Sequence, residues 1–442
     1  MGRFDLKRSP LKLLRLATIN LLVLFVLLET TSAVFYYLKT GEFFYSRKEG
    51  HANSSRASFE TSFQQAANDM SIIYQFHPYF GFVYRQGYVQ GPYLNSPNSS
   101  SYPANNFGFL SLDSFPFKKT KKNQFIIGVF GGSVATIFSF CERENHFLAN
   151  ALKRIPAFQN KEIIVLNFAA GGYKQPQQLL VLNYFLSIGQ ELDMVINIDG
   201  VNETEYWNNR FGVDVSMPIV HVALPLVDLA NKDLSSEELT LSLEILQIKG
   251  KLRDAPARLD NRMLATSYAL SWIQIRYLQS QYRKKAEAFA LVKRNGQGKD
   301  SLIHLNRIEK PLDDSEAYEQ MTNVWANSSL AMKELLSARN VLYFHFIQPN
   351  QYYPTGRQFS EEEKKIAIEQ GNPLQESIAN AYPKLLSRLV SLQALGVHAF
   401  SAVDAFDDVK DAVYADNTCH YNKLGNEALG NYIARRIIGV LQ

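Results

Sequence analysis

The fold class is decided by the stretch QFIIGVFGGSVA, residues Gln124–Ala135. It begins with a nearly continuous apolar run, which is typical of a strand buried on both faces of a parallel sheet. Gly131 and Gly132 end the run, and the residues from Ser133 to about 154 have helical spacing. Strand, tight turn and helix in this order predict the first unit of an α/β sheet.

Four further apolar runs have the same character. A helical stretch lies near Gln175–Ser187, and an amphipathic helix from about Lys423 to Leu441 closes the chain. The repeated pattern predicts a three-layer α/β/α fold with a five-stranded, largely parallel sheet. The four runs are Glu162–Ala170, Asp193–Gly200, Asn340–Pro349 and Val397–Phe406.

The N-terminus carries a membrane signal. The net charge of +4 lies entirely within residues 1–15, so the rest of the chain has no net charge and we expect no nucleic-acid partner. An apolar segment of 23 residues follows, Leu16–Leu38, with one charged residue, Glu29. Its length can span a bilayer core of roughly 30 Å, and the basic residues before it keep the N-terminus cytoplasmic. The sequence therefore predicts a single-pass anchor with the following domain in the periplasm or at the cell surface.

Two features of this segment leave alternatives open. A signal peptide cleaved near Thr31–Ala33 would export the same domain without an anchor. Glu29 is either functional, as an ionisable group in a membrane often is, or it reaches the interface from its place toward one end of the span. We expect an uncleaved anchor with Glu29 at the interface.

Residues suited to acyl transfer follow the predicted strands at their carboxyl ends, where open parallel sheets bind ligands. Ser133 follows the first strand, Gly172 the second and Asn202 the third, and His420 precedes the last helix. A serine nucleophile needs a base and a third group that orients the base, and His420 and Asp416 fit these roles. The backbone N–H groups of Ser133 and Gly172 and the side-chain amide of Asn202 are candidate oxyanion donors. Each residue alone is more often a turn, cap or loop residue, so the inference rests on the ordered set.

This ordered set resembles the SGNH (GDSL-like) hydrolase superfamily in its membrane-anchored bacterial form. The segment Gly131–Ser133 reads GGS where many members have GDS, and Gly172 stands for the second block. Gly200–Glu203 reads GVNE where many members end in Asp, and His420–Asn426 is similar to the closing H-x-N-x-x-G-N block. The resemblance implies a flavodoxin-like sheet and a serine-dependent esterase that uses no metal and no organic cofactor.

The resemblance covers roughly residues 74–228 and 341–442, and it has one departure. The superfamily places its aspartate three residues before the histidine, where this chain has Asn417, whereas Asp416 lies four residues before His420. An Asp-to-Asn change in this role costs about 10⁴ in the turnover of a serine protease. We expect Asp416 to support His420, and a Ser133–His420 dyad is the alternative.

The sequence predicts five regions. Three stretches with helical spacing, residues 235–251, 261–294 and 314–338, interrupt the strand–helix alternation and form an insertion. The residues 77–110 are rich in Tyr, Gly, Asn and Ser and predict an irregular surface layer. The regions are a cytoplasmic tail and transmembrane signal-anchor (1–38), a stalk (39–75), the first part of the catalytic domain (76–228), the helical insertion (229–338) and the second part of the catalytic domain (339–442).

Three functions are consistent with this sequence. The leading one is hydrolysis of a small acyl ester, for example on an envelope glycan, through an acyl-enzyme on Ser133. The second is an O-acyltransferase that uses the same residues beside a membrane-embedded acyl-donor protein, and the third is an inactive binding module.

The chain has two cysteines, Cys141 and Cys419, which excludes a zinc site of paired cysteines. We expect these two thiols to be unpaired, because two helical turns carry Cys141 about 12 Å from the nucleophile along the helix axis.

Overall fold

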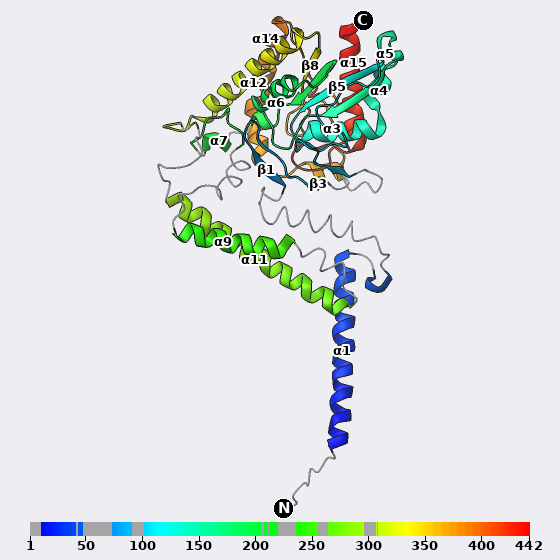
Figure 1. The fold of residues 1–442 in the computed structure, drawn as a ribbon, viewed down its shortest axis with the longest axis vertical. Coiled ribbons are helices and arrows are strands. Elements are labelled where there is room, and N and C mark those ends of the chain that lie inside the picture. The colour runs from blue at the N-terminus through cyan, green and yellow to red at the C-terminus, as the bar shows by residue number, and fades with distance from the viewer. Residues whose placement is uncertain are drawn as a thin grey trace, which may run out of the picture. The chain divides into compact units, whose positions relative to one another are not determined.

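The computed structural model describes residues 10–40, 43–46, 73–90, 101–204, 207–210, 212–219, 236–253, 264–295, 306 and 308–442 (Figure 1). The chain forms two compact units. The anchor unit comprises Met1–Asp69 and Asn231–Leu302. The sheet unit comprises Met70–Ala230 and Ile303–Gln442.

A five-stranded, all-parallel sheet forms the centre of the sheet unit, in the strand order β6-β5-β7-β8-β9. Every strand lies within one of the apolar runs predicted from the sequence, and β7 is buried along its whole length. The strands are β5 (Gln124–Gly131), β6 (Glu162–Asn167), β7 (Met194–Asp199), β8 (Leu342–Ile347) and β9 (His398–Ser401).

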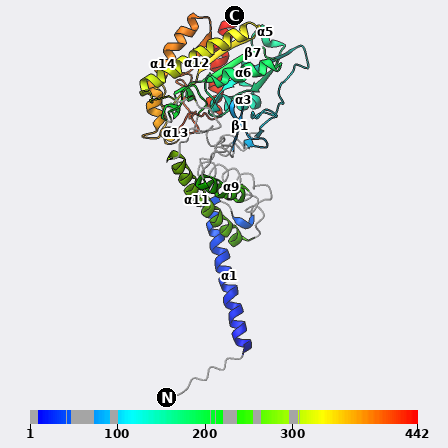
Figure 2. The same cartoon turned by 60° about the vertical axis from the view of Figure 1, so that its left-hand side comes forward.

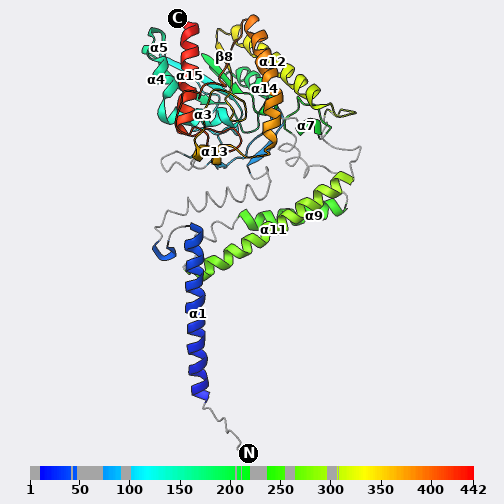
Figure 3. The same ribbon diagram turned by 180° about the vertical axis from the view of Figure 1, so that it is seen from behind.

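Helices cover both faces of this sheet (Figures 1 and 3). Helix α3 (Ser133–Asn145) packs on the sheet with α4 (Phe147–Leu152) and α15 (Lys423–Leu441), whereas α6 (Gln177–Ser187), α12 (Asp314–Ser337) and α14 (Pro373–Ala394) form the other group. The predicted three-layer α/β/α fold is confirmed. Shorter helices in the connections are α5 (Pro156–Gln159), η4 (Asn202–Thr204), α7 (Trp207–Arg210) and α13 (Glu361–Ala367).

Helix α12 differs from the expected insertion, residues 229–338, because it belongs to the sheet unit. Its buried face includes Met321 and Trp325, and it packs against β8 and α14. A capping box between Asp313 and Glu316 starts the helix. Helical spacing in the sequence shows that such a helix has an apolar face, but it does not show which surface that face covers.

The tyrosine-rich segment is more regular than expected. Two short antiparallel pairs form in and just before the predicted irregular layer: β1 (Tyr74–His77) with β2 (Gly81–Tyr84), and β3 (Val89–Gln90) with β4 (Tyr102–Pro103). The first pair and its turn contribute aromatic side chains such as Phe80 and Phe82, which are fully buried in the core. Strands of two to four residues are too short for an alternating pattern to stand out among turn residues.

The anchor unit contains one helix among the described residues that is long and apolar enough to cross a membrane. It is α1 (Pro10–Thr40), whose segment Leu14–Leu38 has a mean hydropathy of 1.9. Helix α11 (Ala265–Asn295) packs against α1 and against α9 (Ser236–Arg253), and a short η1 turn (Phe44–Ser46) follows α1 (Figure 2). Most of the predicted stalk, residues 39–75, lies outside the described residues.

Candidate active site

The site lies at the point where the order of the strands reverses. The chain runs from β5 to β6 on one side of β5 and then to β7 on the other side. In open α/β sheets, ligands bind beyond the carboxyl ends of the strands at such a switch point. Gly131 ends β5 with a φ of +143°, and a Cβ there would lie 2.0 Å from the carbonyl oxygen of Ile198 in β7. Only glycine therefore permits the two strand ends to approach and places Ser133, the first residue of α3, beside the β7 loop.

Ser133, His420 and Asp416 form a continuous hydrogen-bonded chain. Ser133 Oγ lies 2.7 Å from His420 Nε2. The other ring nitrogen, Nδ1, contacts Asp416 Oδ2. Ser133 and His420 are both half-buried, so this arrangement reaches the surface of the protein. The order of hydroxyl, imidazole and carboxylate is the one that activates a serine for nucleophilic attack.

The carboxylate of Asp416 also closes the loop that carries His420. Its Oδ1 accepts the backbone N–H groups of Thr418 (2.9 Å) and Cys419 (3.1 Å) and the hydroxyl of Thr418 (2.6 Å). Burial alone would raise the pKa of Asp416, but the hydrogen bond and charge of His420 and the bonds from Thr418 hold it well below its ordinary value. The residue is thus an ionised partner for the imidazole.

Asn417 has a different role in the same loop. Its side-chain amide donates to Glu369 Oε2 at 2.6 Å, and its carbonyl oxygen accepts the hydroxyl of Tyr352 at 2.9 Å. Asn350 donates to the carbonyl oxygen of Thr418 at 3.1 Å. The turn that follows β8 therefore holds the loop that carries His420 through hydrogen bonds to its backbone carbonyl oxygens.

The candidate oxyanion donors come from the β5, β6 and β7 loops. Asn202 begins the η4 turn after β7, and its amide donates to the carbonyl oxygen of Tyr173 at 2.8 Å. Gly132 lies directly beside it, because a Cβ on Gly132 would be 2.2 Å from Asn202 Nδ2. Gly172 precedes Tyr173 and has a φ of +79°, which favours glycine. These contacts bring the Gly172 loop and Asn202 to the N-terminus of the helix that Ser133 begins.

Two tyrosines near this loop were missed by the sequence reasoning. The hydroxyl of Tyr74 donates to the carbonyl oxygen of Gly171 at 3.2 Å, and that of Tyr84 accepts the Gly171 N–H at 3.1 Å. Burial raises the pKa of both tyrosines. They come from the β1–β2 hairpin and fix the conformation of the loop before Gly172. Tyr84 lies in the segment that was expected to form an irregular surface layer, and Tyr74 lies in the predicted stalk, so neither was singled out.

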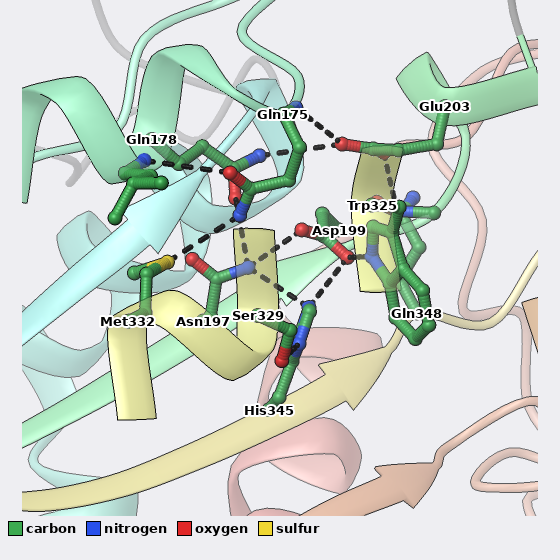
Figure 4. A network of polar contacts seen from close by, with 12 residues as sticks. Gln175, Gln178, Asn197, Asp199, Glu203, Trp325, Ser329, Met332, His345 and Gln348 are labelled. Carbon is green, nitrogen blue, oxygen red and sulfur yellow. Dashed lines mark hydrogen bonds and ion pairs between the residues drawn. The ribbon is translucent and has the colours of Figure 1, made fainter. Parts of the chain in front are cut away.

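A buried polar network lies behind the β7 loop (Figure 4). Glu203 accepts the backbone N–H groups of Gly200 (2.9 Å) and Gln175 (3.1 Å), and so ties the loop that carries Asn202 to the one that follows Tyr173. Burial, and then the charge of Asp199, raise the pKa of Glu203 well above its ordinary value. Through Glu203, the network thus fixes the loop that carries Asn202.

A second Ser–His–Asp arrangement lies inside this network. Ser329 Oγ is 2.7 Å from His345 Nδ1, and His345 Nε2 is 2.9 Å from Asp199 Oδ1 (Figure 4). Ser329 and His345 are 0% and 1% exposed. A substrate cannot reach them, and Asp199 also accepts the indole N–H of Trp325 at 2.8 Å. This second set is therefore a structural polar cluster, and the accessible set contains Ser133.

Among the described residues, no group of three or more His, Cys, Asp or Glu side chains is arranged to hold a metal ion. Cys141 and Cys419 are both free thiols. Burial raises the pKa of Cys141 to about 12, so that thiol stays protonated.

Comparisons with known proteins add little to this geometry. No family model matches the chain. No curated protein matches it either. Among solved structures, an acetyl xylan esterase (AlAXEase) aligns with 72% of this chain and 100% of its own length, at 10% identity and a TM-score of 0.32. A likeness this distant carries no argument about function.

Proposed function

We propose that the protein is a serine-dependent esterase of the SGNH type, with Ser133 as nucleophile, His420 as general base and Asp416 as the acid that orients the base. The observation that carries the proposal is the chain of contacts from Ser133 Oγ through His420 to Asp416, at the switch point of the sheet. Its exposure distinguishes it from the buried cluster around Ser329.

The geometry supports a two-step reaction. His420 Nε2 takes the proton of Ser133 as Oγ attacks the ester carbonyl, and Asp416 stabilises the imidazolium that forms. The Asn202 amide, with backbone N–H groups of Ser133 and Gly172, stabilises the negative charge on the carbonyl oxygen. His420 then returns the proton to the departing alcohol, which leaves Ser133 acylated. Water deprotonated by His420 attacks the acyl-enzyme, and the acid and free serine are released.

The same residues serve a second reaction if a sugar hydroxyl replaces water in the last step. The apolar helix α1 favours this alternative, because it would hold the enzyme beside a membrane-embedded acyl donor. The contact between Asp416 and His420 supports an active enzyme over an inactive binding module.

We also propose that residues 1–38 anchor the protein and that the sheet unit, Met70–Ala230 and Ile303–Gln442, is one catalytic domain outside the cytoplasm. The basic N-terminal tail supports this orientation. Small acyl esters of envelope glycans would then be within reach.

An esterase assay tests the proposed function. The purified full chain should hydrolyse a chromogenic acetyl ester, and Ser133→Ala should lose this activity. Ser329→Ala is the matched control and should retain most of it. Adding a glycan acceptor and analysing the products separates the two reactions: free acid indicates an esterase, and acylated glycan indicates a transferase. Full activity in Ser133→Ala would exclude both.

A further inference from the structure

Glu29 is the single charged residue in the apolar segment of α1. It lies fourteen residues after Arg15, or about 21 Å along the axis at the ~1.5 Å rise of an α-helix. If Arg15 marks the first boundary of a hydrocarbon core roughly 30 Å thick, Glu29 lies about 9 Å inside the second boundary, deeper than the interfacial position expected from the sequence. A carboxylate at that depth needs hydrogen-bond donors, because no water is available there.

Those donors come from the first turn of α11. Glu29 Oε1 accepts the backbone N–H of Ala265 at 2.5 Å, and Oε2 accepts the N–H of Thr266 at 3.1 Å. The hydroxyl of Tyr45 also donates to Glu29. The first N–H groups of a helix have no partner within the helix and carry a partial positive charge, so they suit a carboxylate. Glu29 and the N-terminus of α11 thus satisfy each other.

Aromatic packing continues this contact along α1. Tyr36 lies edge-on to Tyr268, with ring centroids 4.9 Å apart, and Phe35 packs in the same manner on Trp272 at 5.0 Å. Tyr36 is 4% exposed and Ala265 is fully buried between the helices. Helix α11 therefore begins at the depth of Glu29 and stays beside the last turns of α1.

The first part of α11 is suited to a lipid environment. No charged residue occurs from Leu264 to Ile275, a length of about 17 Å. Leu270, Ile273 and Tyr277, at helical spacing on one face, are 63%, 58% and 62% exposed. The helix becomes basic from Arg276 onward, one residue before Tyr277, and Arg276 lies over the ring of Trp272.

We propose that the first part of α11, from Ala265 to Ile275, is embedded in the bilayer leaflet nearer the C-terminal end of α1, pinned there by Glu29, and that its exposed apolar side chains contact lipid. The occupant is a bilayer because α11 packs directly on α1, whose apolar side chains from Leu16 to Leu28 are largely exposed. The basic residues that follow would lie at the lipid headgroups. The helices α9 and α11 then form a second membrane contact, which fixes their position relative to the bilayer. This proposal does not depend on the reaction that the sheet unit catalyses.

Tryptophan quenching by brominated lipid tests this proposal. The chain has three tryptophans, Trp207, Trp272 and Trp325, and Trp325 is fully buried in the sheet unit. The full chain carrying Trp207→Phe is reconstituted into phosphatidylcholine vesicles with bromine at acyl carbons 6 and 7, and into matched unbrominated vesicles. Brominated lipid should quench its emission, and adding Trp272→Phe should abolish the quenching while the emission of Trp325 reports that the fold is intact. If the quenching is absent or does not depend on Trp272, the proposal is overturned, and this face contacts water or a protein partner instead.

The role of Glu29 is tested in the same vesicles. Glu29→Leu leaves the N–H groups of Ala265 and Thr266 without their acceptor, so Trp272 should be quenched less than in the parent. Thr30→Val is the matched control, because the Thr30 hydroxyl is exposed and donates to Val26 within its own helix. Equal quenching in the Glu29 and Thr30 variants would refute the role of Glu29 in holding α11. The test of lipid contact, which compares the chain with and without Trp272, does not require the Glu29 variant to fold.

Discussion

Asp416 contacts Nδ1 of His420 although it lies four residues before the histidine, one more than the usual spacing of the superfamily that the sequence resembles. The extra residue is accommodated by a tight turn, in which Asp416 Oδ1 accepts the N–H groups of Thr418 and Cys419. Asn417 is turned outward to Glu369. The carboxylate thus reaches the imidazole through the conformation of the loop, without the usual spacing.

The first prediction follows from this loop. Asp416→Asn should lower kcat by about 10³–10⁴, because an amide neither fixes the imidazole tautomer nor stabilises the imidazolium. Asn417→Ala should change kcat less than about tenfold, since that side chain contacts Glu369. Steady-state kinetics on a chromogenic ester measures both variants, and the reverse ranking would show that the acid has been wrongly assigned.

The oxyanion assignment makes a second prediction. Asn202→Ala should lower kcat by about 10²–10³ with little change in KM, because the lost hydrogen bond forms chiefly in the transition state. Asn183 is an exposed asparagine on α6, so Asn183→Ala is a suitable control and should behave as wild type. A raised KM with an unchanged kcat would place Asn202 in ground-state binding instead.

Glu203 is predicted to position Asn202. Glu203→Ala leaves the buried N–H groups of Gly200 and Gln175 unpaired, at about 1–3 kcal/mol each, and should lower kcat through a loosened loop. Glu203→Gln should restore part of kcat, because its one amide oxygen can accept only one of the two N–H groups that the two carboxylate oxygens of Glu203 accept. Equal losses of kcat in both variants, at unchanged thermal stability, would contradict a positioning role.

Stability is predicted to depend on pH through Glu142. Burial raises the pKa of Glu142 to about 7 from an ordinary value of 4.5, despite the N–H groups of Leu148 and Ala149 that it accepts. Between these two values the folded chain keeps a proton that the unfolded chain has lost, so this group makes the free energy of unfolding fall as pH rises from about 4.5 to 7. The fall is on the order of 3 kcal/mol, since one pKa unit corresponds to about 1.4 kcal/mol.

Urea unfolding at pH 5 and pH 8 measures this effect. Wild type should lose stability relative to Glu142→Gln between the two pH values, because the glutamine does not titrate. Glu144→Gln removes an exposed carboxylate from the same helix and should keep the wild-type dependence. A parallel pH dependence of wild type and Glu142→Gln would refute the assignment.

The sheet was predictable from the sequence because each strand is a local apolar run, and β7 is buried on both faces. The positions of Ser133, Gly172 and Asn202 followed from the same runs, since the carboxyl ends of parallel strands share one edge, whereas His420 was placed by the last helix that it precedes. Contacts between distant segments were not predictable in this way. The capping of α11 by Glu29 joins residues 236 positions apart, and no local pattern encodes such a contact.

Covalent labelling of Ser133 tests the central claim most directly. The full chain is treated with a fluorophosphonate, which acylating serine enzymes attack with their nucleophile, and the labelled peptide is identified by mass spectrometry. The account predicts one adduct, on Ser133, that is absent in Ser133→Ala and forms far more slowly in His420→Ala, while Ser329→Ala labels as wild type does. An adduct on another serine, or hydrolysis that survives in Ser133→Ala, would contradict it.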